Sequence, residues 1–316
     1  METINKHISA WTRIKQCVKE VIPSTTKTCI WLLKITIGVS ILILVLRYLK
    51  ILPWFSNAIS PLFNHIGLPG EAALSYVTGF FVNVYAAIPV AVSCNLDVRS
   101  LTILSVMILC SHNMITETAV QKKTGSSAIR MVIIRIASAF ILAFVLNKIL
   151  PGSITENTLS ASHNNASLTE LLDAWWRSTL SIIIKMTILI YSLAILQKIL
   201  SEFGVIRWIS KFLRPILAFF GLPAKTSFLW IVANILGLAY GAAVMMEETN
   251  AGKVNKKEID LLNTHISISH SNLEDLILLS SIGGIWYVLL LTRWAGSFLL
   301  VWEQRLEYYI KEHKKK

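Results

Sequence analysis

Six runs of apolar residues, each close to the length of a membrane span, constrain this chain more than any other feature of its sequence. A helix needs about 20 mostly apolar residues to cross the hydrocarbon core of a bilayer. No water bonds the backbone there, so a spanning segment must be helical or belong to a closed barrel. The sequence therefore predicts an all-α membrane protein with about six full transmembrane helices, at residues 30–46, 72–92, 128–146, 180–199, 227–246 and 282–300.

Two further segments, residues 101–119 and 259–280, are hydrophobic but studded with polar side chains. The first contains "LCSHNMITETA" and the second "LLNTHISISHSNLEDLILLSS". Irregular backbone is tolerated at membrane depth only where it is buried in protein or where it lines a water-filled cavity. We therefore expect two broken or re-entrant segments, and whether they cross the membrane or turn back is left open.

The chain contains an internal repeat. Residues 54–70, "WFSNAISPLFNHIGLPG", align without a gap to residues 208–224, "WISKFLRPILAFFGLPA". Downstream, Ser111-His112 aligns with Ser269-His270, Glu117 with Asp275, and Arg135 with Arg293. Such ordered matches between polar residues indicate that one structural unit occurs twice.

The repeat divides the chain into five parts. A first unit at 28–149 returns as a second unit at 179–302, and residues 150–178 form an external loop and linker between them. Residues 1–27 carry apolar side chains at helical spacing among basic ones, which predicts an amphipathic surface helix. Residues 303–316 form a basic cytoplasmic tail. The segments at 54–70 and 208–224 are too short to span, and their Trp residues are typical of interfacial helices.

The orientation of the two units depends on the polar segments. If these segments re-enter, each unit crosses the membrane three times and the two units are inverted; if they cross, each unit has four crossings and both point the same way. The inverted arrangement places 18 Lys and Arg inside and 7 outside, against 16 and 9 for the alternative. Because cytoplasmic loops are enriched in Lys and Arg, we expect inverted repeats. Both termini and the 121–130 loop then face the cytoplasm, and the 247–258 loop is external.

The polar segments supply the candidate binding residues. Inverted repeats with interrupted segments at matching places are typical of transporters whose site lies near the bilayer midplane. Ionisable residues inside a membrane are functional candidates by default, although a single buried His is more often structural. We expect the substrate site to be lined by His112, Asn113, Glu117, His270, Asn272, Glu274 and Asp275.

Arg135 and Arg293 are the most costly intramembrane residues, since an Arg at the centre of a span costs about 2.5–3.5 kcal/mol on insertion scales. Each should therefore have a partner, and Glu117 and Asp275 are the natural ones. We predict structural ion pairs that brace each broken segment against the next helix, ahead of a direct contact with substrate.

Composition excludes several other classes of function. The formal net charge is +12, but the basic residues flank spans and accompany no nucleic-acid-binding motif, so we expect no nucleic-acid partner. No phosphate-binding loop or hydrolase motif occurs, and the protein is not expected to be an enzyme or to need a cofactor. The spacing of His112, Glu117, His270 and Asp275 is not diagnostic of a metal site, so no resident metal is predicted.

These features together resemble a known family. A Gly-Leu-Pro entry, a span of small residues, a broken Ser-His-Asn…Glu segment and a following helix with Arg resemble the nucleoside recognition, or Gate, domain. That domain occurs in pairs in bacterial ferrous-iron transporters, and related versions occur in concentrative nucleoside transporters and spore maturation membrane proteins. The resemblance covers nearly all of 28–302 as two copies. It implies a multi-pass protein of a prokaryotic inner membrane, although the GTPase domain of the iron transporters has no counterpart in this sequence.

The sequence thus predicts a transporter of a small polar solute, nucleoside-like, or of an ion, through a midplane site between the two units. Its partners would be the lipid bilayer and that solute, with a second copy or another membrane protein left open. Two alternatives stay open as well: a non-transporting membrane scaffold or regulator, and a component of a divalent-cation permease.

Overall fold

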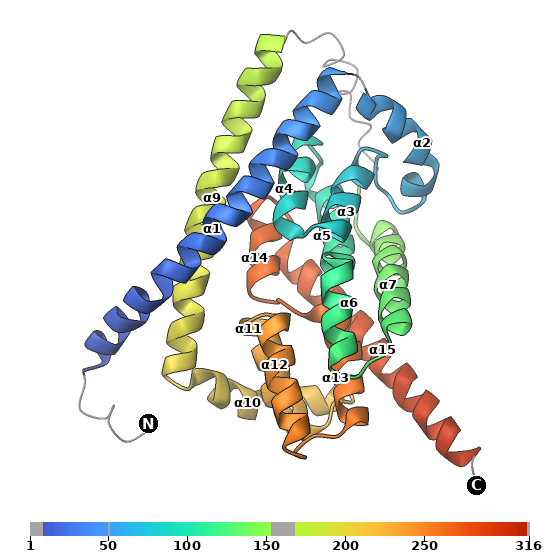
Figure 1. Cartoon of the computed structure of the whole chain (residues 1–316). Coiled ribbons are helices and arrows are strands. Elements are labelled where there is room, and N and C mark those ends of the chain that lie inside the picture. Colours follow the sequence, from blue (N-terminus) through green and yellow to red (C-terminus); the bar gives the residue numbers. More distant parts are fainter. Residues whose placement is uncertain (1–8, 50, 153–167, 315–316) are drawn as a thin grey trace.

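The computed structural model describes residues 9–49, 51–152 and 168–314, which form helices and connecting turns without any strand. Four helices in this described part are long and apolar enough to cross a membrane: Ala10–Tyr48, Val98–Lys123 counted through a short interruption, Ala128–Ile149 and Thr169–Glu202. The all-helical membrane fold that the sequence predicts is therefore present (Figure 1).

The helices of the two sequence units follow each other in the same order. The first unit holds α1 (Ala10–Tyr48), α2 (Ile51–His65), α3 (Ala72–Phe81), α4 (Val84–Ser93), α5 (Val98–Ser111), α6 (Met114–Lys123) and α7 (Ala128–Ile149). The second holds α9 (Leu168–Glu202), α10 (Val205–Phe219), the short η3 (Ala224–Thr226), α11 (Ser227–Ile235), α12 (Leu238–Asn250), α13 (Lys256–Ser269), α14 (Glu274–Ser281) and α15 (Trp286–His313).

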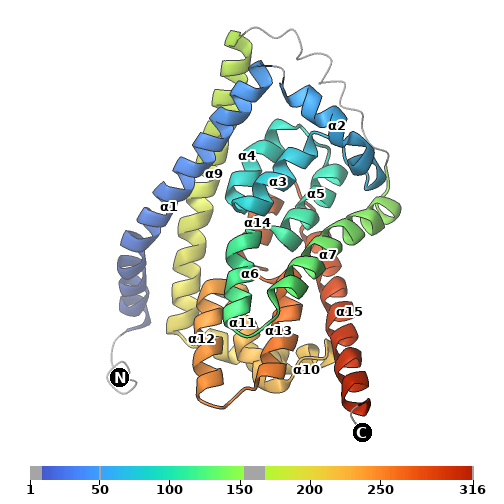
Figure 2. The ribbon, with the colours of Figure 1, turned by 45° about the vertical axis from the view of Figure 1, so that its right-hand side comes forward.

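Corresponding long helices of the two units pack side by side in opposite directions. Arg13 near the start of α1 pairs with Glu202 at the end of α9 at 3.0 Å, whereas Trp175 near the start of α9 donates to Ser40 at 3.2 Å. The α7 and α15 helices likewise run antiparallel. In both views α2 lies at one end of the molecule and α10 at the other (Figures 1 and 2).

Two of the predicted continuous spans, 72–92 and 227–246, are wrong: each is a pair of short helices folded back on itself. The Ser75 hydroxyl on α3 donates to the Ala87 carbonyl on α4 at 2.9 Å. In the second unit, a Cβ added at Gly241 would lie only 2.9 Å from the Ala233 Cβ. Small residues therefore let the two arms of each hairpin approach closely. The turn at Asn83 stops the helix because its side chain accepts from the Ala86 N–H and caps α4.

Each polar segment is an interrupted helix that runs through the bundle and does not turn back. At one end of α5, Arg99 donates to the Asn147 carbonyl at 2.9 Å. The residues that follow α6 lie at the opposite end, where Thr124 accepts a 2.8 Å hydrogen bond from Asn263. The α5–α6 pair therefore runs from one end of the bundle to the other (Figure 2), and α13–α14 repeats this arrangement.

The predicted placement of the 247–258 loop on the face opposite the 121–130 loop is also wrong. Ser126 donates to the Asp260 carboxylate at 2.5 Å, so the α6–α7 and α12–α13 connections share one face. The start of α1 and the end of α15 lie at this same face (Figure 1). Among the described residues outside the spans, 18 Lys and Arg lie at this face and 4 at the other. The reassignment thus strengthens the charge asymmetry.

Three predicted boundaries also differ. Residues 10–27 are the first half of α1 and not a separate surface helix, because they pack on the end of α9; Thr26 bonds Tyr191 at 2.7 Å. The predicted 150–178 loop loses its last part to α9, which begins at Leu168. The predicted 303–316 tail continues α15 to His313. Residues 1–8, 153–167 and 315–316 lie outside the described residues.

Single cysteines test this arrangement of faces. In a variant whose four native cysteines are replaced, we expect Lys123→Cys and Lys253→Cys to react with an impermeant thiol reagent from the same side of the membrane. Lys148→Cys should react from the opposite side, because α7 runs between the two faces. All three positions are exposed. Labelling of positions 123 and 253 from opposite sides would contradict the fold.

Candidate functional site

The candidate site lies where the two interrupted helices break. Asn113, between α5 and α6, and Ser271, between α13 and α14, adopt left-handed backbone with φ of 48° and 49°. Such values are uncommon for residues other than Gly, and their matching positions indicate that both breaks are specified features. The Asn113 N–H bonds the Gly79 carbonyl at 2.9 Å, which docks the first break on the tip of the α3–α4 hairpin.

The residue before each left-handed position is a buried histidine. The Nδ1 atom of His112 lies 3.0 Å from the Ile108 carbonyl, and that of His270 lies 2.7 Å from the Ile266 carbonyl. A carbonyl oxygen can only accept, so Nδ1 must carry the hydrogen in both rings. The Nε2 atom of each neutral ring is then an acceptor, and both Nε2 atoms point toward the interface between the units.

Four side chains meet at this interface, and we call His112, Glu117, His270 and Asp275 the His–carboxylate cluster. The two Nε2 atoms are 3.3 Å apart. Glu117 Oε1 lies 3.1 Å from each of them, and Asp275 Oδ2 lies 3.3 Å from His112 Nε2. All four residues are buried. Each histidine contacts the acid of the other unit, so neither unit forms the cluster alone.

Two fully buried arginines hold the broken ends in place. Arg135 donates to the carbonyls of Cys110 and His112 at 3.0 and 2.6 Å. Arg293 donates to the carbonyls of Ile268 and His270, the same positions in the second unit. A helix that ends inside the membrane leaves its last carbonyls without partners. The arginines supply those partners, which is the bracing role.

The ion pairs of the two arginines differ. Arg135 lies 2.7 Å from Glu117 Oε2, as the aligned positions suggest. In the described part of the chain Arg293 forms no ion pair with Asp275, because that carboxylate faces His112 of the other unit. The repeat is thus symmetrical in its Arg–carbonyl contacts and asymmetrical in its charge pairing.

The other predicted site residues surround the cluster without joining it. Asn272 donates to the Asn234 amide oxygen at 2.6 Å, which docks the second break on the α11–α12 hairpin. Glu274 accepts a 2.5 Å hydrogen bond from Tyr85 on α4. The sequence analysis did not select Tyr85, because this residue lies within an apolar run and no local feature of the sequence marks its contact with Glu274.

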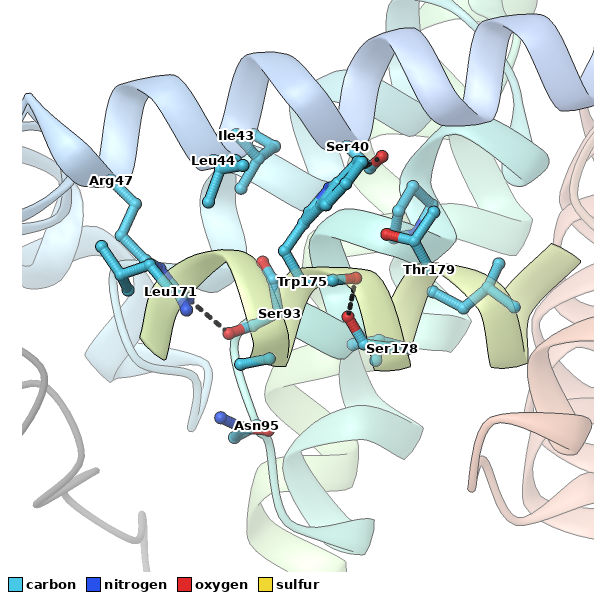
Figure 3. Close-up of a pocket in the computed structure, with 14 residues that line it drawn as sticks. Ser40, Ile43, Leu44, Arg47, Ser93, Asn95, Leu171, Trp175, Ser178 and Thr179 are labelled. Carbon is cyan, nitrogen blue, oxygen red and sulfur yellow. Dashed lines mark hydrogen bonds between the residues drawn. The ribbon is translucent and has the colours of Figure 1, made fainter. Parts of the chain in front are cut away.

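Two cavities lie along the seam between α1 and α9, one beside residues 24–32 of α1 and the other beside residues 40–47. One, of about 200 Å³, reaches Tyr85 and Glu274. The other, of about 140 Å³, has polar groups from Ser40, Arg47, Ser93, Trp175 and Ser178 (Figure 3). Its Arg47 donates to the Ser93 carbonyl at 2.6 Å. Between the cavities the buried side chains of Thr36 and Met186 close the seam.

Comparisons with known proteins agree with the family resemblance. Residues 29–145 match the family model named Gate, described as nucleoside recognition. This confirms the resemblance for the first unit, and the family is associated with membrane transport rather than catalysis. The chain is also similar to "Uncharacterized membrane protein YvoD" of Bacillus subtilis, with 29% identity over 272 residues, 84% of this chain and 87% of that protein. No solved structure matches the chain.

The Arg135 contacts predict a specific pattern of stability losses. Arg135→Ala should lower the free energy of unfolding by about 3–5 kcal/mol, because it strands a buried carboxylate. Adding Glu117→Ala should recover only part of the loss, since two carbonyls stay without donors. Thermal unfolding in detergent measures both effects.

Arg130→Ala is the matched control for Arg135→Ala. Arg130 pairs with Glu303 and Glu307 at 2.6 and 2.5 Å but is partly exposed, so its loss should cost at most about 1 kcal/mol. Strictly additive losses in the Arg135/Glu117 double variant would rule out the ion pair, and complete recovery would rule out the role of the carbonyl contacts.

Proposed function

We propose that this protein transports a small polar solute or an ion across the membrane through the His–carboxylate cluster. The observation that carries the proposal is that both units deliver an interrupted helix, a histidine and an acid to one buried point. A scaffold would need each break only to be closed by its own arginine. Closing the breaks does not require the imidazole and carboxylate groups that face the interface. These groups suit a site that replaces the hydration shell of a solute.

The helix directions support an inverted arrangement of the two units. Each unit has two long helices, one interrupted helix and one folded-back hairpin. Three crossings per unit, an odd number, place the second unit upside down relative to the first. This agrees with the antiparallel pairing of α1 with α9. The face that carries most Lys and Arg is then cytoplasmic, together with both termini.

We propose that the solute reaches the cluster along the α1–α9 seam, where the two cavities lie and where Glu274, the neighbour of Asp275 in the sequence, lines one of them. On α1 they are bounded by Leu32 and Ser40, and on α9 by Ile190 and Ile182. Eight residues of helix correspond to about 12 Å, and the packed side chains of Thr36 and Met186 lie within this distance. Since no nucleotide-binding motif occurs in the sequence, a gradient or a partner protein supplies the driving force.

Uptake by proteoliposomes tests the proposed function. A thermal-shift panel of nucleosides and ions first identifies the solute that stabilises the purified protein. His112→Gln and His270→Gln should then each reduce uptake of that solute by about tenfold or more, the cost of one lost hydrogen bond to a charged group. The variants should fold, because the Gln amide can still bond a backbone carbonyl.

His65→Gln is the control for general effects of the substitution, because His65 is an exposed residue at the end of α2. Uptake of the solute by the His65→Gln variant should equal uptake by the parent. Folded His112→Gln and His270→Gln proteins that both transport like the parent would refute the proposed function and favour the scaffold.

A further inference from the structure

We propose that the solute bound by the His–carboxylate cluster is a divalent first-row transition-metal ion, coordinated by His112, His270 and Asp275, with Glu117 next to both imidazoles. This inference rests on the proposed function and names its substrate class. The ligand atoms of His112, His270 and Asp275 all lie within 4.8 Å of one another. Glu117 Oε1 is 3.1 Å from both imidazole Nε2 atoms.

The first argument is the direction of the lone pairs. Both imidazoles use their Nδ1–H groups on backbone carbonyls, so both Nε2 atoms present lone pairs to the interface. Two carboxylate oxygens face the same point. With both rings neutral, no hydrogen lies between these four acceptors, and a cation, either a proton on one ring or a metal ion, removes their repulsion. Imidazole held through its second nitrogen by a backbone carbonyl is also the usual arrangement around a bound metal.

The second argument is the spacing of the ligand atoms. Metal–nitrogen and metal–oxygen bonds of about 2.0–2.2 Å in a tetrahedral site place ligand atoms roughly 3.3–3.5 Å apart. The Nε2–Nε2 distance and the distance from His112 Nε2 to Asp275 are both 3.3 Å, and the two Glu117 contacts are 3.1 Å. These distances suit one ion held by the two imidazoles and the Asp275 carboxylate, with Glu117 Oε1 beside both imidazoles.

The third argument is the chemistry of the donor set. Two imidazoles with carboxylates suit Zn²⁺, Fe²⁺, Co²⁺ or Ni²⁺, whereas Mg²⁺ and Ca²⁺ prefer oxygen ligands alone. Arg135 holds the second oxygen of Glu117 at 2.7 Å, which orients the first oxygen toward the histidines. Glu274, next to Asp275, lines the 200 Å³ cavity and accepts a hydrogen bond from Tyr85 there.

Metal titration of the purified full-length chain tests the inference. We expect one Co²⁺ per chain with the visible absorption of tetrahedral Co²⁺, displaced by Zn²⁺ but not by Mg²⁺. His112→Gln and His270→Gln should each weaken Co²⁺ binding by more than about tenfold, the least that loss of even a supporting partner costs.

His265→Gln is the matched control. His265 is a buried imidazole that bonds Trp230 and Ser269 and lies outside the cluster, so its loss should leave Co²⁺ affinity unchanged. Absence of saturable Co²⁺ binding, or binding that survives both cluster substitutions, overturns the inference. If the cluster variants do not fold, X-ray absorption of the Co²⁺-loaded parent decides: a shell with two imidazoles supports the site, and a shell of oxygens alone refutes it.

The test separates this inference from the proposed function. Uptake of another solute by a protein that binds no Co²⁺ refutes the metal ion and leaves the transporter. Co²⁺ bound at the cluster, with no uptake of metal or any other solute into proteoliposomes, refutes the transporter and with it the role of the metal as substrate.

Discussion

The contact on which the rest of the structure depends is the bond between a buried arginine and the carbonyls of a helix that ends inside the membrane. An interrupted helix exposes carbonyls that water cannot reach, each at a cost of several kcal/mol. Arg135 and Arg293 meet this need at equivalent positions, each bridging two carbonyls. Because these donors are in place, the left-handed turns at Asn113 and Ser271 can persist, and the histidine before each turn faces the other unit.

The charge of the arginines has consequences for the surrounding residues. A guanidinium without water needs anions nearby, and Glu117 provides one directly to Arg135. Asp275 instead turns to His112. Glu117 and Asp275 therefore link the two units. The residues that close the ends of the interrupted helices thus also help to form the site that the units share. The folded-back hairpins complete it, since their tips bond both breaks through Gly79 and Asn234.

The sequence was sufficient to predict the repeat, the all-helical membrane fold and the grouping of His112 with Glu117, because polar residues in an apolar chain are costly and few. It did not reveal the hairpins. A run of about 20 apolar residues has the same sequence pattern whether it spans the membrane or folds back. The turn at Asn83 depends on one side-chain cap. The sequence analysis treated the hairpins as spans and the interrupted helices as re-entrant segments, and this exchange also placed the 247–258 loop on the wrong face. The contacts of Tyr85 with Glu274, and of Asp275 with His112, join distant parts of the chain and have no local signal.

The central claim, that the two units share one site, is tested most directly by a double-mutant cycle between them. Glu117→Gln in the first unit and His270→Gln in the second are measured singly and together by thermal unfolding. The account predicts that their effects on the free energy of unfolding depart from additivity by more than about 0.5 kcal/mol, whereas Glu117→Gln and His265→Gln are additive. Additive effects of Glu117→Gln and His270→Gln in folded proteins would contradict it.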